Sequence, residues 1–159
     1  MANLYSPLIN INKTHILQEY FIPIYPASNF IVWMNYLRKI FKKINKCINL
    51  LNITIRYVKQ DNVTFLKYAQ TDVYAFVFYY RIDCNTQADK LKKLHNKLTN
   101  KILELNGTFY LPYRHHYSYT QLKKAYPNIY HFFILKKKYD SIEMFSNMWY
   151  EKYKFINSF

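Results

Sequence analysis

The order of helix-like and strand-like segments constrains the fold of this 159-residue chain more than any other feature. Apolar residues recur at helical spacing over residues 30–48, and basic residues fill the opposite side of this segment. The pattern predicts a long amphipathic helix. A second helix is predicted over residues 86–105, where leucines recur at the same spacing. We expect Thr86 to be its N-cap and Asn106 and Gly107 to form its C-cap.

Four segments have strand-like sequences. Residues 15–26 are rich in β-forming residues and close at two prolines, while residues 49–60 alternate between apolar and polar side chains. Residues 73–82 are apolar along almost their whole length, which indicates a central strand. Residues 108–113 form the fourth predicted strand, which Pro112 ends.

The resulting order, β-α-β-β-α-β, is typical of the ferredoxin-like α+β fold, in which two helices cover a mostly antiparallel four-stranded sheet. We expect residues 15–113 to form this unit and residues 114–159 to form a helical C-terminal extension of the same domain. The extension contains three segments with helix-forming patterns: residues 118–125, 128–138 and 142–155. Asp140 is the expected cap of the last helix.

The chain is strongly basic, with a formal net charge of +14 from 23 Lys and Arg against 9 Asp and Glu. Such a charge favours an anionic partner. An alternative is a general inflation of Lys, Asn, Ile and Tyr, as in proteins from AT-rich genomes, because the lysines are scattered over many segments. Cys47 and Cys84 have no paired spacing, and no apolar run reaches the length of a membrane span. We therefore expect a cytoplasmic location.

The aromatic segment within residues 73–82 permits a nucleic-acid interpretation. The run from Tyr74 to Tyr79 matches the second half of the aromatic signature of RNA-recognition motifs, whose rings stack on bases. Asp72 and Val73 stand where that signature has a basic residue and a glycine. A single-stranded RNA-binding module that uses a basic, aromatic sheet is the alternative function, and a buried core strand is the simpler interpretation of the same residues.

Other sites are not indicated. His115 and His116 are adjacent, so their side chains point in different directions and are poorly placed to hold one metal ion. The chain has no glycine-rich phosphate loop and no paired carboxylates. We therefore expect no metal site, and no complete catalytic machinery in this chain by itself.

Polar residues at alternating strand positions are the strongest candidates for a site. Glu19 lies on the first predicted strand, Thr54 and Arg56 share one side of the second, and Arg114 follows the fourth. Arg56 and Arg114 are suited to hold an anionic group or to stabilise negative charge that develops on a bound molecule. An ordinary solvated sheet face with one Glu-Arg pair is the alternative.

Several stretches together resemble the C-terminal half of FAD-linked oxidases of the vanillyl-alcohol oxidase superfamily. The similar branch contains the aldonolactone oxidases, alditol oxidases and decaprenylphosphoryl-ribose oxidases. The stretches are LQEYFIP, LNITIRYV, YAFVFYY, LNGTFYLPYRHHYS and AYPNIYHFFILKKKYDSIEMFSNMWY, and they span most of the chain from Ile16 to Tyr153. Ser141 stands where the family has a proline after the aspartate of the last stretch.

This resemblance implies a cap domain whose sheet lies over the isoalloxazine ring of FAD and lines the substrate side. It places the family's cationic positions on Arg56 and Arg114, which are therefore the expected catalytic residues. The other positions that it implies for contact with substrate or cofactor are Glu19, Thr54, Tyr113 and His116. A cation near the ring stabilises the negative charge that appears on hydride transfer.

In this family a separate N-terminal domain with a glycine-rich loop holds most of FAD, and that loop does not occur in this sequence. The resemblance therefore implies one of three things: a split-gene product that pairs with an FAD-domain polypeptide, a remnant of an oxidase, or a cap reused for binding. The expected substrate is a small polyol or sugar lactone. The chain by itself is expected to be inactive as an oxidoreductase.

Overall fold

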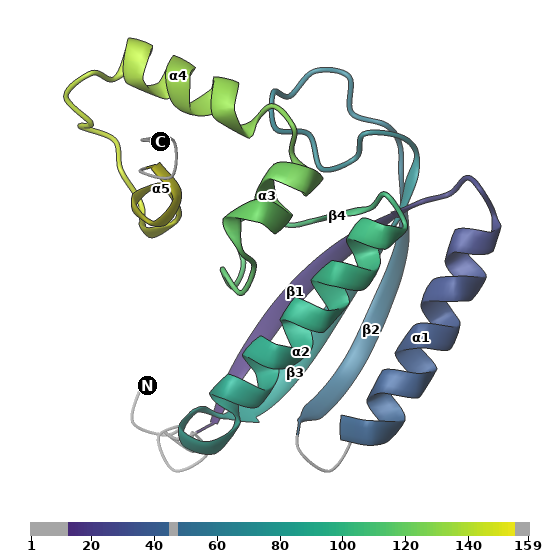
Figure 1. The fold of residues 1–159 in the computed structure, drawn as a ribbon. Helices are drawn as coiled ribbons and strands as arrows, with labels where there is room; N and C mark the ends of the chain where they lie inside the picture. The colour runs from purple at the N-terminus through teal and green to yellow at the C-terminus, as the bar shows by residue number, and fades with distance from the viewer. Residues whose placement is uncertain (1–12, 45–47, 155–159) are drawn as a thin grey trace, which may run out of the picture.

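The computed structural model describes residues 13–44 and 48–154, with the side chains of residues 84 and 85 left out. Cys47 and the predicted end of the last helix at Phe155 lie outside this description. The first six elements are β1 (Lys13–Pro23), α1 (Ser28–Ile44), β2 (Asn49–Val58), β3 (Val73–Asp83), α2 (Cys84–Glu104) and β4 (Thr108–Phe109). Their order is the predicted β-α-β-β-α-β (Figure 1).

The four strands form one sheet in the order β2-β3-β1-β4, and every neighbouring pair is antiparallel. Strand β3 is therefore central, as its apolar sequence predicts, and it pairs with β1 over its whole length from Val73 to Asp83. Helices α1 and α2 run side by side along one side of the sheet (Figure 1). The predicted ferredoxin-like arrangement is confirmed.

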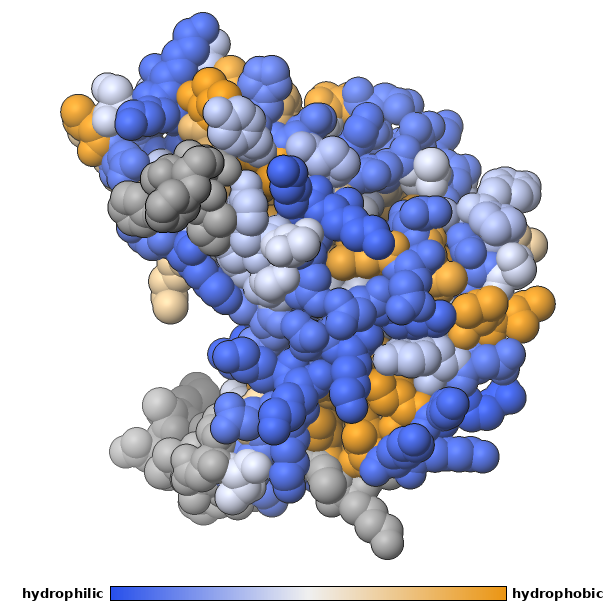
Figure 2. Space-filling view, viewed as in Figure 1, coloured by the Kyte–Doolittle hydropathy of each residue, from blue (hydrophilic) through white to orange (hydrophobic). Residues whose placement is uncertain are grey.

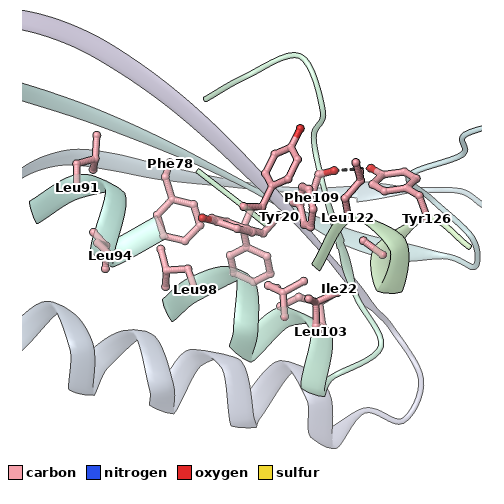
Figure 3. Packing of buried hydrophobic residues seen from close by; sticks show 14 of the residues in the cluster. Tyr20, Ile22, Phe78, Leu91, Leu94, Leu98, Leu103, Phe109, Leu122 and Tyr126 are labelled. Atoms are coloured by element: carbon pink, nitrogen blue, oxygen red, sulfur yellow. Dashed lines mark hydrogen bonds between the residues drawn. The ribbon is translucent and has the colours of Figure 1, made fainter. Parts of the chain in front are cut away.

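The main core lies between the sheet and the two helices. Trp33 of α1 packs against the rings of Tyr20, Phe76 and Phe78, with ring centroids 6.0, 6.1 and 6.4 Å away. The hydroxyl of Tyr20 donates to the backbone carbonyl of His95 on α2 at 3.4 Å. Figure 3 shows Leu98 of α2 beside the rings of Phe78 and Tyr20. Large aromatic side chains on one side of β1 and β3 thus bind both helices to the sheet.

The other side of the sheet, which we call the open face, carries no helix of the ferredoxin-like unit. Its side chains alternate with the core residues along each strand. They are His15, Leu17, Glu19 and Phe21 of β1, Asn52, Thr54 and Arg56 of β2, and Ala75, Val77, Tyr79 and Arg81 of β3. The loop between β2 and β3 covers one end of this face, where Tyr68 stacks on Phe21 with ring centroids 4.4 Å apart.

The end of α2 is capped by the predicted pair. Asn106 adopts a left-handed φ of 56°, and the Gly107 N–H donates to the carbonyl of Ile102 at 2.9 Å. Gly107 is required by crowding, since a Cβ there would lie 2.3 Å from the carbonyl oxygen of Phe21. The turn thus brings the chain directly against β1.

The start of α2 and the end of β4 differ from the predictions. Helix α2 begins at Cys84 instead of after Thr86, because the side chain of Gln87 accepts the backbone N–H of Asp83 at 2.9 Å and caps an earlier start. Strand β4 contains only Thr108–Phe109 instead of residues 108–113. One further ladder bond forms at Tyr110, and the strand cannot continue past Pro112, which has no N–H to donate.

The extension forms three short helices: α3 (Tyr119–Ala125), α4 (Ile129–Tyr139) and α5 (Met148–Tyr153). Ser118 and Gln121 cap the start of α3 through a reciprocal pair of hydrogen bonds. Tyr126, just after α3, connects the extension to the ferredoxin-like unit, because its hydroxyl donates to the Phe109 carbonyl (Figure 3). One cluster of buried side chains runs from the sheet into these helices.

The last predicted helix is shorter than expected, and Asp140 is not its cap. The Asp140 carboxylate instead accepts the backbone N–H groups of Met144 at 2.8 Å and Phe145 at 3.0 Å, which fixes a turn. Glu143 within this turn has a left-handed φ of 54° and cannot be helical. Asn147 caps α5 through its side chain. Within residues 13–44 and 48–154, no helix combines the length and apolarity needed to cross a membrane.

Candidate functional site

An ion pair lies on the open face. The Arg56 guanidinium donates through Nη2 to Oε1 of Glu19 at 2.6 Å. The Glu19 side chain is 7% exposed and the Arg56 side chain is 57% exposed. The carboxylate is therefore buried beneath a guanidinium that keeps further N–H donors for a ligand.

Tyrosine rings surround this pair and form a hollow, which we call the Glu19–Arg56 hollow, with a volume of about 330 Å³. The rings of Tyr110 and Tyr113 meet edge to face with centroids 4.9 Å apart, and Tyr68 lies 6.0 Å from Tyr110. The lining residues are Glu19, Phe21, Arg56, Tyr57, Val58, Tyr68, Tyr110 and Tyr113. The hollow thus combines aromatic walls with one exposed cation.

The phenol of Tyr113 faces the ion pair, and its pKa is raised. Burial is the largest cause, the Glu19 carboxylate raises the pKa further, and the Arg56 charge partly opposes both. The Tyr113 hydroxyl is therefore protonated at neutral pH and available as a hydrogen-bond donor. A neutral or anionic ligand with a flat, polarisable ring matches these groups, because rings pack on rings and the guanidinium favours negative charge.

The open face continues beyond the hollow as a flatter, largely exposed surface. Thr54 lies two residues before Arg56 on β2, opposite Val77, and is exposed. Leu17 of β1 is 39% exposed on the same face. At the far end, Tyr79 forms a hydrogen bond with His15. The candidate site is thus a hollow at one end of an uncovered sheet surface.

The structure separates the predicted site residues into two groups. Glu19, Arg56 and Tyr113 come together in the hollow, with Thr54 beside them on the open face. Arg114 and His116 lie where the chain turns toward α2. No hydrogen bond or ion pair within the described ranges joins them to Glu19 or Arg56.

His116 instead pairs with a histidine of α2. Its Nδ1 lies 2.9 Å from Nδ1 of His95, which is only 1% exposed. Burial lowers the pKa of His95 to about 3, and the charges of His116 and Arg114 act in the same direction. Burial and the nearby cations, Arg114 first among them, lower the pKa of His116 to about 4. Both imidazoles are therefore neutral at pH 7.

The aromatic residues in the run from Tyr74 to Tyr79, which suggested RNA binding, are divided between the two faces of the sheet. Phe76 and Phe78 are 0% exposed in the core beneath α1 and α2, Tyr74 packs against Phe30 of α1, and Tyr79 lies partly exposed on the open face. The rings of Phe76 and Phe78 are thus not accessible for stacking on bases. In the part of the chain that the structure describes, no three His, Cys, Asp or Glu side chains form a group suited to a metal ion.

Sequence reasoning missed three residues that contribute to these sites. His95 carried a usable signal, because it lies four residues after Leu91 and three before Leu98, on the apolar side of α2. Tyr110 had a weaker signal, which was only its place near the end of the predicted strand, two residues before Pro112. Tyr68 had none, because its position depends on how the loop between β2 and β3 folds back over the sheet.

Comparison of the chain with models of known protein families finds no match, and comparison with curated proteins finds none either.

Proposed function

We propose that this chain is the substrate-binding cap of an FAD-dependent oxidoreductase that acts on a sugar lactone or an alditol, with FAD held mainly by a separate FAD-binding domain. The observation that carries the proposal is the Glu19–Arg56 pair, set among tyrosines on the uncovered side of a ferredoxin-like sheet. The sequence resemblance supports the choice of family, and the surface around this pair suits the cofactor of that family.

The residues present fit a flavin ring. No helix of the ferredoxin-like unit covers the open face. This surface is therefore suited to lie over one side of a planar ring while another domain lies over the other side. Tyr110 and Tyr113 offer aromatic edges, and Arg56 offers donors that are not used by Glu19. FAD, when bound, supplies the hydride-accepting ring of the reaction.

Arg56 is the residue assigned to electrostatic stabilisation. Its guanidinium is charged at any working pH, and it lies in a partly enclosed site where charge interactions are stronger than in bulk water. Negative charge on a ring beside it is therefore stabilised. Glu19 positions Arg56 by holding Nη2 at 2.6 Å and also moderates its charge.

Hydroxyl groups near the pair suit a neutral, polyhydroxylated substrate. Tyr113 is a protonated donor beside the carboxylate, and Thr54 offers a donor and an acceptor on the adjacent surface. Arg114 and His116 are not assigned to this pocket, because their charges and contacts involve α2. A sugar lactone or alditol bound between Tyr113 and Thr54 is the substrate geometry that we propose.

Co-expression with an FAD-domain polypeptide from a neighbouring gene tests the proposal. The co-purified complex is expected to carry flavin with a perturbed visible spectrum, and Arg56→Met is expected to change that spectrum. Arg81→Met removes an exposed arginine from the same sheet and is expected to leave the spectrum unchanged. A stable complex whose flavin spectrum is the same with and without Arg56→Met would contradict the proposal.

The RNA-binding alternative has no comparable support on the open face. Phe76 and Phe78 of the RNA-like run are buried in the core, and Tyr79 is the one ring of that run on the open face. Titration with single-stranded RNA at two salt concentrations tests it directly, since submicromolar affinity with a steep salt dependence would favour it over the oxidoreductase cap.

A further inference from the structure

A second hollow lies on the helix side of the molecule, opposite the open face. Its volume is about 610 Å³. It is lined by Asp89, Lys92, Lys93, Asn96 and Lys97 of α2 and by His116. The α2 residues follow one another at helical spacing, so they share one side of the helix. Figure 2, viewed from this side, shows a hydrophilic surface across α2.

The charges of this basic hollow are unbalanced. It has three lysines and a single carboxylate, that of Asp89. None of the three lysines forms an ion pair within the described part of the chain. Positive charges held this close repel one another, and a bound anion relieves the repulsion.

Two further cations, Lys152 and Arg114, act on the histidine that lines the hollow. Lys152 of α5 donates to the backbone carbonyl of His115 at 2.5 Å. Burial lowers the pKa of Lys152, and the charge of Lys92 lowers it further. Arg114 is near enough to act on His116. Cations from three parts of the chain thus converge on one region.

The histidine pair gives this hollow a neutral donor with a defined partner. In the 2.9 Å contact, one Nδ1 donates and the other accepts, since both rings are neutral at pH 7. His116 therefore has Nε2 left for a ligand. Behind it, Nε2 of His95 is buried without a hydrogen-bond partner among the described residues. The pair fixes the orientation of His116 from within the protein.

We propose that this basic hollow binds the phosphate group of a phosphorylated ligand. The ammonium groups of Lys92, Lys93 and Lys97 supply the charge, and Asn96 and His116 supply neutral donors. A phosphate dianion has enough oxygens and charge to engage several of these groups at once. A carboxylate carries one charge and leaves most of the cations unpaired. The site is separate from the open face and independent of flavin.

Binding of phosphate has a titration consequence. A phosphate anion beside His116 offsets the cations that depress its pKa, namely Arg114, Lys92, Lys152 and, when protonated, His115. When His116 then gains a proton, both of its ring nitrogens are donors, so His95 must take the tautomer whose Nδ1 accepts, and the pair then remains hydrogen-bonded. Asp89 opposes binding of the dianion but leaves the balance positive. Between the free and the raised pKa of His116, binding is therefore coupled to proton uptake by this imidazole.

NMR titration of the histidine C2–H signals in the full chain tests this site. Saturating inorganic phosphate or pyrophosphate is expected to raise the pKa of His116 from about 4 by one unit or more. The exposed His131 is the internal reference and is expected to shift much less. Equal shifts of the two histidines, or no shift of His116, would overturn the proposal.

Paired variants separate a built site from general attraction to a basic protein. Lys93→Gln with Lys97→Gln is expected to weaken pyrophosphate binding at least tenfold. Lys39→Gln with Lys42→Gln removes the same charge from the exposed side of α1 and is expected to weaken it less than twofold. All four lysines are exposed, so both variants should keep the urea unfolding midpoint of the parent. Equal losses of affinity in the two double variants would show that pyrophosphate binds only through non-specific attraction to a basic protein.

The source of the phosphate is distinguished by three probes. Pyrophosphate stands for a small phosphorylated molecule, vesicles with phosphatidic acid stand for a lipid headgroup, and a short single-stranded RNA stands for a phosphodiester backbone. Binding of either of the first two that is lost with Lys93→Gln and Lys97→Gln supports the proposal. Binding of RNA alone, weakened equally by the α1 control, would overturn it.

Discussion

The Arg56 guanidinium reaches the Glu19 carboxylate at 2.6 Å although their strands, β2 and β1, are separated by β3. Arg56 is directly opposite Ala75 of β3, and Glu19 is opposite Val77. The arginine side chain therefore crosses the central strand, and the small side chain of Ala75 leaves room for it. This contact fixes the position of the cation that the proposed function depends on.

The first prediction concerns the stability of this pair. Arg56→Met leaves the buried Glu19 carboxylate without its partner and should lower the free energy of unfolding by about 1–3 kcal/mol. Adding Glu19→Gln should recover part of the loss, because no buried charge remains. Urea unfolding of both single variants and the double variant measures the coupling.

Arg81→Met is the matched control, since Arg81 is an exposed arginine on the same sheet. It should change the free energy of unfolding by less than about 0.5 kcal/mol. Strictly additive effects of the Glu19 and Arg56 substitutions would show that the pair contributes nothing in solution.

The second prediction concerns the turn after α2. Gly107→Ala forces a Cβ against the Phe21 carbonyl and should lower the free energy of unfolding by about 1–3 kcal/mol, which corresponds to a fall in Tm of about 3–9 °C. Asn106→Gly should be tolerated, because Asn106 already has a left-handed φ of 56° that glycine adopts freely. Thermal denaturation followed by circular dichroism compares the two. Similar losses from both substitutions would contradict this account of the turn.

The third prediction concerns pH. The pKa values of His95 and His116 in the folded chain, about 3 and about 4, lie below the ordinary value of about 6.5 in the unfolded chain. The unfolded chain therefore binds protons first as the pH falls. The contribution of these neutral histidines to the free energy of unfolding is fully present above about pH 6.5 and is lost as the pH falls toward 4. His95 alone contributes a slope of up to about 1.4 kcal/mol per pH unit.

Urea midpoints between pH 7.5 and 4.5 measure this slope. His95→Leu should flatten it, whereas His131→Leu, at an exposed position, should not. The carboxylates whose pKa values are lowered in the fold, such as Asp140 and Glu143, affect stability only at lower pH. A stability profile that is flat from pH 6.5 to 4.5 would exclude a buried neutral histidine pair.

The fourth prediction concerns the turn before α5. Asp140→Ala removes the acceptor of the Met144 and Phe145 N–H groups, so their amide hydrogen exchange should become several-fold faster. Asp61→Ala removes a similar acceptor from a different loop, that of the Val63 and Thr64 N–H groups. It should leave exchange at Met144 and Phe145 unchanged, and an equal effect of both substitutions would point to general loosening instead.

The regular elements were predictable because the spacing of apolar residues along the sequence follows which side of each helix or strand is buried. The alternation around Thr54 and Arg56 identified the open face of β2, and the apolar run of β3 identified the central strand. Boundaries were less predictable where side chains bind the backbone. Gln87 and Asp140 each form such bonds, and these bonds moved a helix start and replaced the beginning of another helix with a turn.

The candidate site was predictable only where strands carry it. Glu19 and Arg56 meet because sheet register determines their separation. Arg114 and His116 follow Tyr113 closely in sequence, and yet the chain turns toward α2 after it. That turn depends on the contact of His116 with His95 and on the packing of α5, for which neighbouring sequence carries no signal.

The reduction potential of the flavin in the complex with an FAD-domain polypeptide tests the central claim most directly. If the Glu19–Arg56 pair faces the ring, Arg56→Met should lower the potential and Glu19→Gln should raise it. Each change should amount to about 30 mV for every 1.4 kcal/mol of altered charge stabilisation. Arg81→Met should leave the potential unchanged. Shifts of the same sign for Arg56→Met and Glu19→Gln, or no shift for either, would contradict a flavin-facing role for this sheet.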